Sequence, residues 1–472
     1  MGAVCTQLSI IERWRHAKVP VDEMARVLEG NYFCDESMPK HDGFPDANKC
    51  RGSGIAHHRS QYGSTETFLC LWQSNTRSVY TSIDMTTAQN FNMSPHSHVL
   101  PPLAQGMAQL LEGITQGATI LARQSDPSLV LKEPSPQQWL MCETSGSSGA
   151  AKTIRRSPAS WQASFAITAT RFGIGANDTY ATFGTLGHSL TLYAALEALH
   201  LGADYIGLAG QSPKRQIEAL TTSRATVIYA TPSQLALLVR GANGVNLPDP
   251  RAIFSGGGKL SDTLRSLLIQ IFPTAKIYEF FGASETSFIT ITDDQTPNGS
   301  VGRPYPNVTL RIGDGLTPNQ TGEVWVQSPY LFDGYATGNS TDTSWDGPFL
   351  SIGEMGYLDE SGHLFLRGRL SRMVTVADKN VFPEEIETLI SQVDGITQCA
   401  AIPLPDPLRG HRIVCVIQSS QPINEAALRQ LCHAKLGPAS VPKTFHRLTE
   451  IPMLAAGKPD LQALRKMLGD LT

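Results

Sequence analysis

The chain has 472 residues, of which 41% are hydrophobic and 17% are charged, compared with about 25% charged residues in an average soluble protein. This composition excludes a disordered protein, which combines low hydrophobicity with high net charge. The formal net charge of −4 argues against a nucleic-acid partner, because such proteins present a basic surface. No apolar run reaches the roughly 18 residues of a transmembrane helix.

The 8 cysteines are scattered and form neither a CxxC pair nor a cysteine–histidine cluster with the spacing of zinc ligands. Scattered cysteines in a large chain are typical of reduced thiols in a cytosolic enzyme. The first residues also lack the charged-then-apolar pattern of a signal peptide. We therefore expect a cytoplasmic protein.

From about Pro102 onward, helix and strand patterns alternate along the chain. The expected elements are a helix at 103–114, a strand at 119–122, helices that open at Ser212-Pro213 and Thr231-Pro232, strands at 225–230, 251–255 and 276–281, and a helix at 261–272. Strands that alternate with helices through short connections predict a parallel sheet covered by helices. Such sheets bind ligands at the carboxyl ends of their strands.

After about residue 300 the pattern changes to short strands between turns rich in Gly and Asp. The expected elements are strands at 322–326 and 363–366, a helix at 383–393, strands at 398–403 and 411–418, and helices at 424–436 and after 460. We predict a multi-domain α/β protein. A large N-terminal domain covers 1–370, with a β-rich subdomain at about 300–370, and a small α+β domain covers 371–472.

The segment 143–152 has the composition of a polyphosphate-binding loop. Small residues expose backbone N–H groups and hydroxyls, and a lysine ends the segment. Its candidate ligand-binding residues are Thr144, Ser145, Gly146, Ser147, Ser148, Gly149 and Lys152. It lacks the spacing of a Walker A loop. A flexible surface turn is an alternative interpretation; a serine amidase is another, but the lysine-based relay of that class is not found.

Four further groups of residues follow strands or precede a helix, and they suit a nucleotide and its metal ion. An aromatic residue beside glycine can cover a base, a carboxylate at a strand end can hold Mg²⁺, and a carboxylate with an arginine suits a ribose and its phosphate. The candidates are Gly256, Gly257 and Gly258; Phe281, Gly282, Ser284 and Glu285; Glu354 and Arg369; and finally Lys458. Taken alone, Lys458 is typical of an exposed loop lysine.

In this order, the motifs of residues 140–465 resemble those of the adenylate-forming superfamily, in particular its acyl-CoA synthetases. The resemblance implies that a carboxylic acid and ATP give an acyl-adenylate and pyrophosphate, with Mg²⁺ as cofactor. It also implies roles for the candidate residues: Thr144, Ser145, Ser147 and Lys152 hold the β- and γ-phosphates, Gly256–Gly258 form the adenine wall, Ser284 contacts the α-phosphate, Glu285 places Mg²⁺, Glu354 and Arg369 contact the ribose, and Lys458 bridges the acid and the α-phosphate.

The same resemblance implies a hinge at Ser371 and an acyl gate at His188 and Ser189. Amino-acid-activating relatives carry Asp where this chain has Ser189, so a substrate ammonium would be buried unpaired. A fatty or aryl carboxylic acid is therefore favoured. A capping histidine is the alternative interpretation of His188.

The expected acceptor of the acyl group is the thiol of CoA. A carrier-protein phosphopantetheine or an amine remains an alternative, because Ala377-Asp378 stands where the family carries a Gly pair beside the pantetheine arm. Two further departures are Glu354 for the usual Asp and Ser284 for the usual Thr. A nucleotide-binding pseudoenzyme is the alternative from another functional class.

Overall fold

The computed structural model describes residues 90–133, 136–145, 151–315, 318–419, 421–453 and 459–469, which belong to one unit, Ala88–Thr472. Four predicted phosphate-binding residues, 146–149, and the predicted catalytic Lys458 lie outside the described residues, as does the side chain of Ser145. In the part that is described, no helix is long and apolar enough to cross a membrane.

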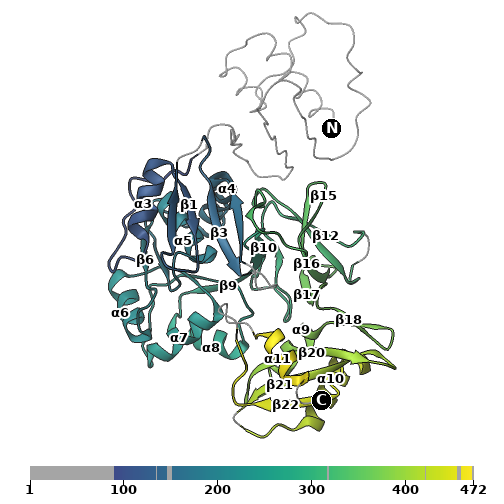
Figure 1. Cartoon of the computed structure of the whole chain (residues 1–472). Coiled ribbons are helices and arrows are strands. Elements are labelled where there is room, and N and C mark those ends of the chain that lie inside the picture. Colours follow the sequence, from purple (N-terminus) through teal and green to yellow (C-terminus); the bar gives the residue numbers. More distant parts are fainter. Residues whose placement is uncertain are drawn as a thin grey trace, which may run out of the picture. The chain divides into compact units, whose positions relative to one another are not determined.

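A seven-stranded sheet carries the predicted strand–helix alternation (Figure 1). In spatial order its strands are β11 (Arg303–Pro304), β10 (Ser287–Ile291), β9 (Lys276–Ala283), β8 (Ala252–Ser255), β7 (Val227–Ala230), β5 (Thr179–Thr182) and β6 (Asp204–Gly207). The five strands from β5 to β9 pair in parallel, whereas β10 and β11 pair antiparallel at one edge. The predicted parallel sheet is confirmed.

Helices cover both faces of this sheet. Successive side chains of a strand point to opposite faces, so apolar residues on both faces need helices to bury them. Tyr180 and Tyr229 pack in one apolar core with α4 and α5, while their neighbours Ala181 and Ile228 pack in a second core with α6, α7 and α8. The helices are α4 (Pro158–Phe172), α5 (Ser189–Leu201), α6 (Pro213–Ser223), α7 (Pro232–Ala242) and α8 (Asp262–Ile271). The predicted caps Ser212 and Thr231 both accept a backbone N–H bond, as expected.

A second sheet, of five strands, carries the predicted phosphate-binding segment. Its order is β14 (Tyr335–Thr337), β4 (Ala151–Arg156), β3 (Leu140–Ser145), β1 (Thr119–Ala122) and β2 (Leu129–Lys132). Helix α3 (Met107–Gln116) packs on β1 and β2. The predicted start of this helix at residue 103 is wrong, because Gly106 has a φ of 86° and cannot continue a right-handed helix.

The β-rich region predicted at about 300–370 is a third sheet of five strands. They are β12 (Thr309–Ile312), β13 (Gly322–Gln327), β16 (Phe349–Leu358), β15 (Ser344–Asp346) and β17 (Leu364–Arg369), which pairs with β16. All of its pairings are antiparallel. This sheet places β16 and β17 side by side just before the predicted hinge.

The C-terminal residues form a hairpin and a three-stranded sheet with helices. The elements are β18 (Val374–Val376), β19 (Lys379–Val381), α9 (Pro383–Ile390), β20 (Ile396–Asp406), β21 (Gly410–Ser419), α10 (Glu425–Leu436), the 3-10 helix η2 (Pro438–Ser440), β22 (Thr444–Leu448) and α11 (Leu461–Gly469). Two apolar cores serve this region, and all of their members lie between residues 374 and 468. The predicted helices and strands are confirmed here with shifts of a few residues at their ends.

Glu197 on α5 is a fully buried carboxyl inside the larger core. Three tyrosine hydroxyls donate to it: those of Tyr180 and Tyr193 at 3.1 Å, and that of Tyr229 at 2.6 Å. Burial raises the pKa of Glu197 to about 7, although the hydrogen bonds oppose this rise. The group therefore links the protonation state of the core to its stability.

Glu197 should make the chain less stable as the pH rises. Its folded pKa of about 7 lies above its ordinary value of 4.5, so the free energy of unfolding falls between these two pH values, by about 3 kcal/mol in total. We expect Glu197→Gln, which cannot ionise, to remove this fall. Urea unfolding of both proteins at pH 5 and pH 8 measures it, and parallel pH profiles would contradict the assignment.

Candidate active site

The predicted phosphate-binding segment spans the hairpin of β3 and β4. Thr144 and Lys152 are directly paired across the two strands, and Lys152 is 7% exposed. A lysine with its stem buried between strands has its ammonium restricted to one region of space. The hairpin thus brings two predicted phosphate-binding residues together at the base of the loop.

The predicted Ser284 and Glu285 occupy the tight turn between β9 and β10, called here the β9–β10 turn (residues 284–286). Gly282 is required there, because a Cβ would lie 1.9 Å from the carbonyl oxygen of Ser287 on the paired strand. The hydroxyl of Thr286 accepts a hydrogen bond from the backbone N–H of Ala283 at 3.0 Å. The turn is therefore closed from within and holds its two candidate residues in place.

Ser284 meets the predicted acyl gate. Its Oγ lies 3.0 Å from Oγ of Ser189, in the first turn of α5. His188 precedes that helix as its N-cap residue, as the alternative interpretation expects, although its side chain makes no capping hydrogen bond. Partial burial lowers the pKa of the His188 ring, which favours the neutral imidazole at neutral pH.

Glu285 is held by a residue that the sequence analysis missed, Tyr335. The Tyr335 hydroxyl donates to Oε1 of Glu285 at 3.0 Å and lies 2.9 Å from Oγ1 of Thr343. Burial is the main cause that raises the pKa of Tyr335 to about 12, so this hydroxyl stays protonated as a donor. Tyr335 lies on β14, which pairs with β4, and the backbone N–H of Phe332 donates to the carbonyl of Glu285 at 2.8 Å, so long-range contacts bring Tyr335 to Glu285.

Glu285 also fits the magnesium ion that the sequence resemblance implies. Among the described residues, no group of three or more His, Cys, Asp and Glu side chains is placed to hold a metal ion. Mg²⁺ does not need such a cage, since it usually binds through one or two carboxylates, substrate phosphates and water. A single carboxylate that is half-buried and oriented by Tyr335 meets this requirement.

The glycine run after β8 has a packing role in addition to the predicted adenine wall. A Cβ on Gly256 would lie 2.2 Å from the ring of Phe280, and Gly257 has a φ of 81°. A Cβ on Gly258 would meet only Pro232, at 3.6 Å. Ser255, at the end of β8, is fully buried, and its hydroxyl has no hydrogen-bond partner among the described residues.

The predicted ribose-binding residues lie beside each other on neighbouring strands of the third sheet. Glu354 and Arg369 are paired in register on β16 and β17, and their side chains form an ion pair of 3.1 Å. Glu354 is 9% exposed. Strand β17 carries the chain to Ser371, whose hydroxyl lies 3.4 Å from Oδ2 of Asp342. The longer Glu354 side chain thus reaches the arginine of the neighbouring strand.

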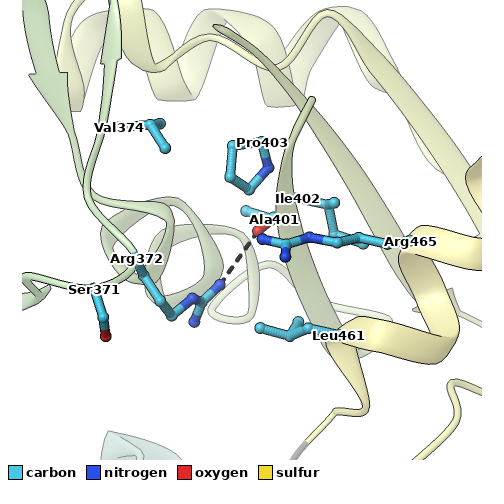
Figure 2. A pocket seen from close by; sticks show the side chains of 8 residues that line it. All are labelled: Ser371, Arg372, Val374, Ala401, Ile402, Pro403, Leu461 and Arg465. Atoms are coloured by element: carbon cyan, nitrogen blue, oxygen red, sulfur yellow. Dashed lines mark hydrogen bonds between the residues drawn. The ribbon is translucent and has the colours of Figure 1, made fainter. Parts of the chain in front are cut away.

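An ion pair and a small pocket follow the predicted hinge. Arg372 forms a two-point ion pair with Glu387 at 2.7 and 3.0 Å and donates to the carbonyl of Ala401 at 3.2 Å. Arg372 and Ala401 line a small pocket with a volume of about 50 Å³, and Figure 2 shows the hydrogen bond between them. Its lining residues are Ser371, Arg372, Val374, Ala401, Ile402, Pro403, Leu461 and Arg465. Leu461 and Arg465 belong to α11, which follows the predicted Lys458 loop.

Ala377 and Asp378 form the two-residue turn between β18 and β19 in the backbone conformation that glycine favours. Their φ angles are 47° and 62°, as in a type I′ hairpin turn. The family's Gly pair thus has a conformational reason in addition to its small size. Asp tolerates this conformation better than Ala does, because its side chain can hydrogen-bond locally.

The first comparison with known proteins places the chain in a family. The model of the family "AMP-binding enzyme" matches residues 76–336, and that of its C-terminal domain matches residues 385–458. The chain belongs to the AMP-binding enzymes. This agrees with the ordered motifs of the sequence and with the residues that the fold brings together.

Curated relatives and solved structures agree with this assignment. The chain is 32% identical to an uncharacterized acyl-CoA ligase, YhfT, of Bacillus subtilis (strain 168), over 74% of this chain and 72% of the relative. It is 26% identical to the 2-succinylbenzoate–CoA ligase of Oceanobacillus iheyensis, over 74% of this chain and 72% of that relative. Among solved structures, the amide bond synthetase McbA from Marinactinospora thermotolerans has a TM-score of 0.62 and 25% identity, with 71% of each chain covered. The o-succinylbenzoate CoA synthetase from Bacillus subtilis has the same TM-score and 22% identity, with 69% of this chain and 68% of that chain covered. At this identity the likeness shows the fold alone.

Loss of the Glu354 carboxylate should weaken nucleotide binding. We expect Glu354→Gln to raise the Kd of AMP about tenfold, because a charged hydrogen bond to the ribose is worth roughly 1.5–3 kcal/mol, while Glu354→Asp keeps the affinity. Isothermal titration calorimetry measures both. Asp346→Asn is the matched control, since Asp346 pairs with Arg311 on the same sheet at 2.7 Å and is well exposed. Equal affinity of Glu354→Gln and wild type would contradict the ribose contact.

Proposed function

We propose that this AMP-binding enzyme is an ATP-dependent, AMP-forming acid–thiol ligase that activates a carboxylic acid and transfers the acyl group to CoA. The observation that carries the proposal is the 3.0 Å contact between Ser284 and Ser189. It joins the residue assigned to the α-phosphate with the residue assigned to the acid, so both reactants would meet at one point. The names of the relatives, acyl-CoA ligases among them, support the same reaction.

The reaction requires two anions to approach each other, so the work of the enzyme is charge neutralisation and in-line positioning. When bound, ATP supplies the α-phosphate, and Mg²⁺ neutralises phosphate charge. Thr144 and Lys152 would hold the outer phosphates at the base of the β3–β4 hairpin, and Glu285 would hold the ion. Lys458 would then bridge the carboxylate and the α-phosphate, and the match to the C-terminal family model extends to residue 458.

The surroundings of the gate favour a compact aryl or short-chain acid over a long fatty acid. Tyr193 lies one helical turn after Ser189 and is buried. Its ring packs edge-on against Phe288 with centroids 5.3 Å apart, and Phe288 packs against Phe280 at 4.5 Å. An acyl chain that passes Ser189 would meet these aromatic rings after about 6 Å, the rise of the four helical residues from Ser189 to Tyr193.

We also propose the domain division at Ser371, with domains 1–370 and 371–472. The separate apolar cores after residue 374 support an independently folded C-terminal domain, and hinges need few contacts of their own. The described cysteines Cys142, Cys399, Cys415 and Cys432 are free and buried, which supports the cytoplasm as the compartment.

Acid-dependent exchange of pyrophosphate into ATP tests the proposed function. We expect exchange with benzoate-type and short-chain acids, and much less with hexadecanoate. Lys458→Ala should lower the rate at least 100-fold, because misplacing one bridging group has effects of this size. Lys466→Ala, on the exposed face of α11, is the matched control. Nucleotide binding without exchange for any acid would instead identify a pseudoenzyme.

Substitutions in the turn of Ala377 and Asp378 test whether CoA accepts the acyl group. Replacing both residues by glycine removes side chains and left-handed strain, and Ala377→Gly alone should stabilise the protein by about 0.5–1 kcal/mol. With CoA, we expect the rate of thioester formation relative to that of exchange to rise several-fold in the double variant. Loss of free thiol measures thioester formation. An acyl group that passes only to amines or to a carrier protein would show that CoA is not the acceptor.

A further inference from the structure

Arg156, at the end of β4, is a fully buried charge with four hydrogen-bond acceptors. Its Nη1 donates to Oγ of Ser160 at 3.3 Å, to Oγ of Ser287 at 2.9 Å and to the carbonyl of Tyr330 at 2.9 Å, and its Nη2 donates to the carbonyl of Ser284. Burial lowers the pKa of Arg156 to about 10, so the guanidinium remains charged at neutral pH. A buried charge with this many partners is costly to displace.

Two of the four acceptors of Arg156 lie on either side of Glu285 in the sequence. Ser284 precedes Glu285 in the β9–β10 turn, and Ser287 follows the turn as the first residue of β10. Arg156 itself lies four residues after Lys152 on the strand that leaves the phosphate-binding segment. One side chain therefore connects the strand of Lys152 to the turn of Ser284 and Glu285.

Ser287 has a backbone conformation that needs such support. Its φ is 55°, a left-handed value that is rare for residues other than glycine. Its hydroxyl accepts hydrogen bonds from Nη1 of Arg156 and from Nε1 of Trp161 at 3.0 Å. The Arg156 guanidinium in turn lies over the Trp161 ring, 4.9 Å from its centroid. Strained residues persist where the surroundings hold them from several sides, as they do here.

We propose that Arg156 is a positioning residue that fixes the β9–β10 turn, so that Ser284 and Glu285 are pre-aligned for the α-phosphate and its magnesium ion. This inference rests on the proposed function. A lysine cannot replace the arginine, because a single ammonium lacks the planar fork that reaches acceptors in several directions. The contact to Ser284 is to its carbonyl oxygen, so it acts on the backbone of the turn and leaves the hydroxyl of Ser284 for the ligand.

The neighbouring Arg155 provides a matched control on the same strand. Its guanidinium also lies over a tryptophan, Trp139, 4.8 Å from the ring centroid. Its side chain donates to the carbonyl of Asp333 at 3.5 Å, and it points to the other face of β4, because successive side chains of a strand alternate. Arg155→Gln thus removes a stacked arginine without touching the β9–β10 turn.

The test measures the Kd of ATP for the full chain with 5 mM Mg²⁺ and with EDTA, by calorimetry. The Kd in EDTA divided by the Kd in Mg²⁺ is called here the magnesium ratio. We expect Arg156→Lys to lower the magnesium ratio about tenfold relative to wild type, while the Kd of AMP changes less than twofold. Arg155→Gln should keep the wild-type ratio. In exchange assays, Arg156→Lys should lower kcat with little change in the KM for the acid. A purely structural arginine would alter thermal stability and leave the magnesium ratio unchanged, which overturns the proposal.

A second variant covers the case in which Arg156→Lys does not fold. Ser287→Ala keeps the buried charge and its other acceptors but removes the hydroxyl that ties Arg156 to the end of the turn. We expect a several-fold loss of the magnesium ratio in this variant, and an unchanged ratio overturns the proposal. A wild-type chain that binds ATP equally with and without magnesium overturns both this inference and the role of Glu285 in the proposed function. If magnesium strengthens ATP binding to the wild type and the variants keep the wild-type magnesium ratio, only this inference is overturned.

Discussion

The burial of the Arg156 guanidinium constrains the geometry of the whole candidate site. A charge without solvent must have hydrogen-bond acceptors in several directions, and this chain supplies them from α4, from the β9–β10 turn and from the segment of Tyr330. Two different sheets therefore meet in one fixed arrangement. The base of the phosphate-binding hairpin lies on one of them, and the turn of Glu285 lies on the other.

The glycines of the motifs have two kinds of role, and the structure separates them. Gly282 permits the close approach of the Ser287 backbone, and Gly256 permits that of the Phe280 ring. Both positions would be restricted to glycine even in a protein without a nucleotide. A Cβ on Gly258 would make only an ordinary contact, at 3.6 Å, with a proline, so contact with a ligand remains the better reason for this glycine.

Most of the fold could be predicted from the sequence, because the signals for it are local. Proline after a capping hydroxyl marked the starts of α6 and α7, and short apolar runs marked β7, β8 and β9. The start of α3 was missed, because the left-handed conformation of Gly106 is not visible in the apolar pattern. Among the site residues, Glu354 and Arg369 were predicted separately, and their pairing follows from the register of β16 and β17.

The sequence by itself determined the order of the motifs, the alternation of strands and helices, and hence the family and the class of reaction. Only the tertiary structure revealed Arg156 and Tyr335, since neither belongs to a motif and both act across distances in sequence of more than 45 residues. It also revealed that the ring of Tyr193, one helical turn after Ser189, packs edge-on against Phe288. The physical reason is that local patterns encode elements and backbone contacts, whereas the partners of a buried charge or an aromatic wall depend on how distant elements pack.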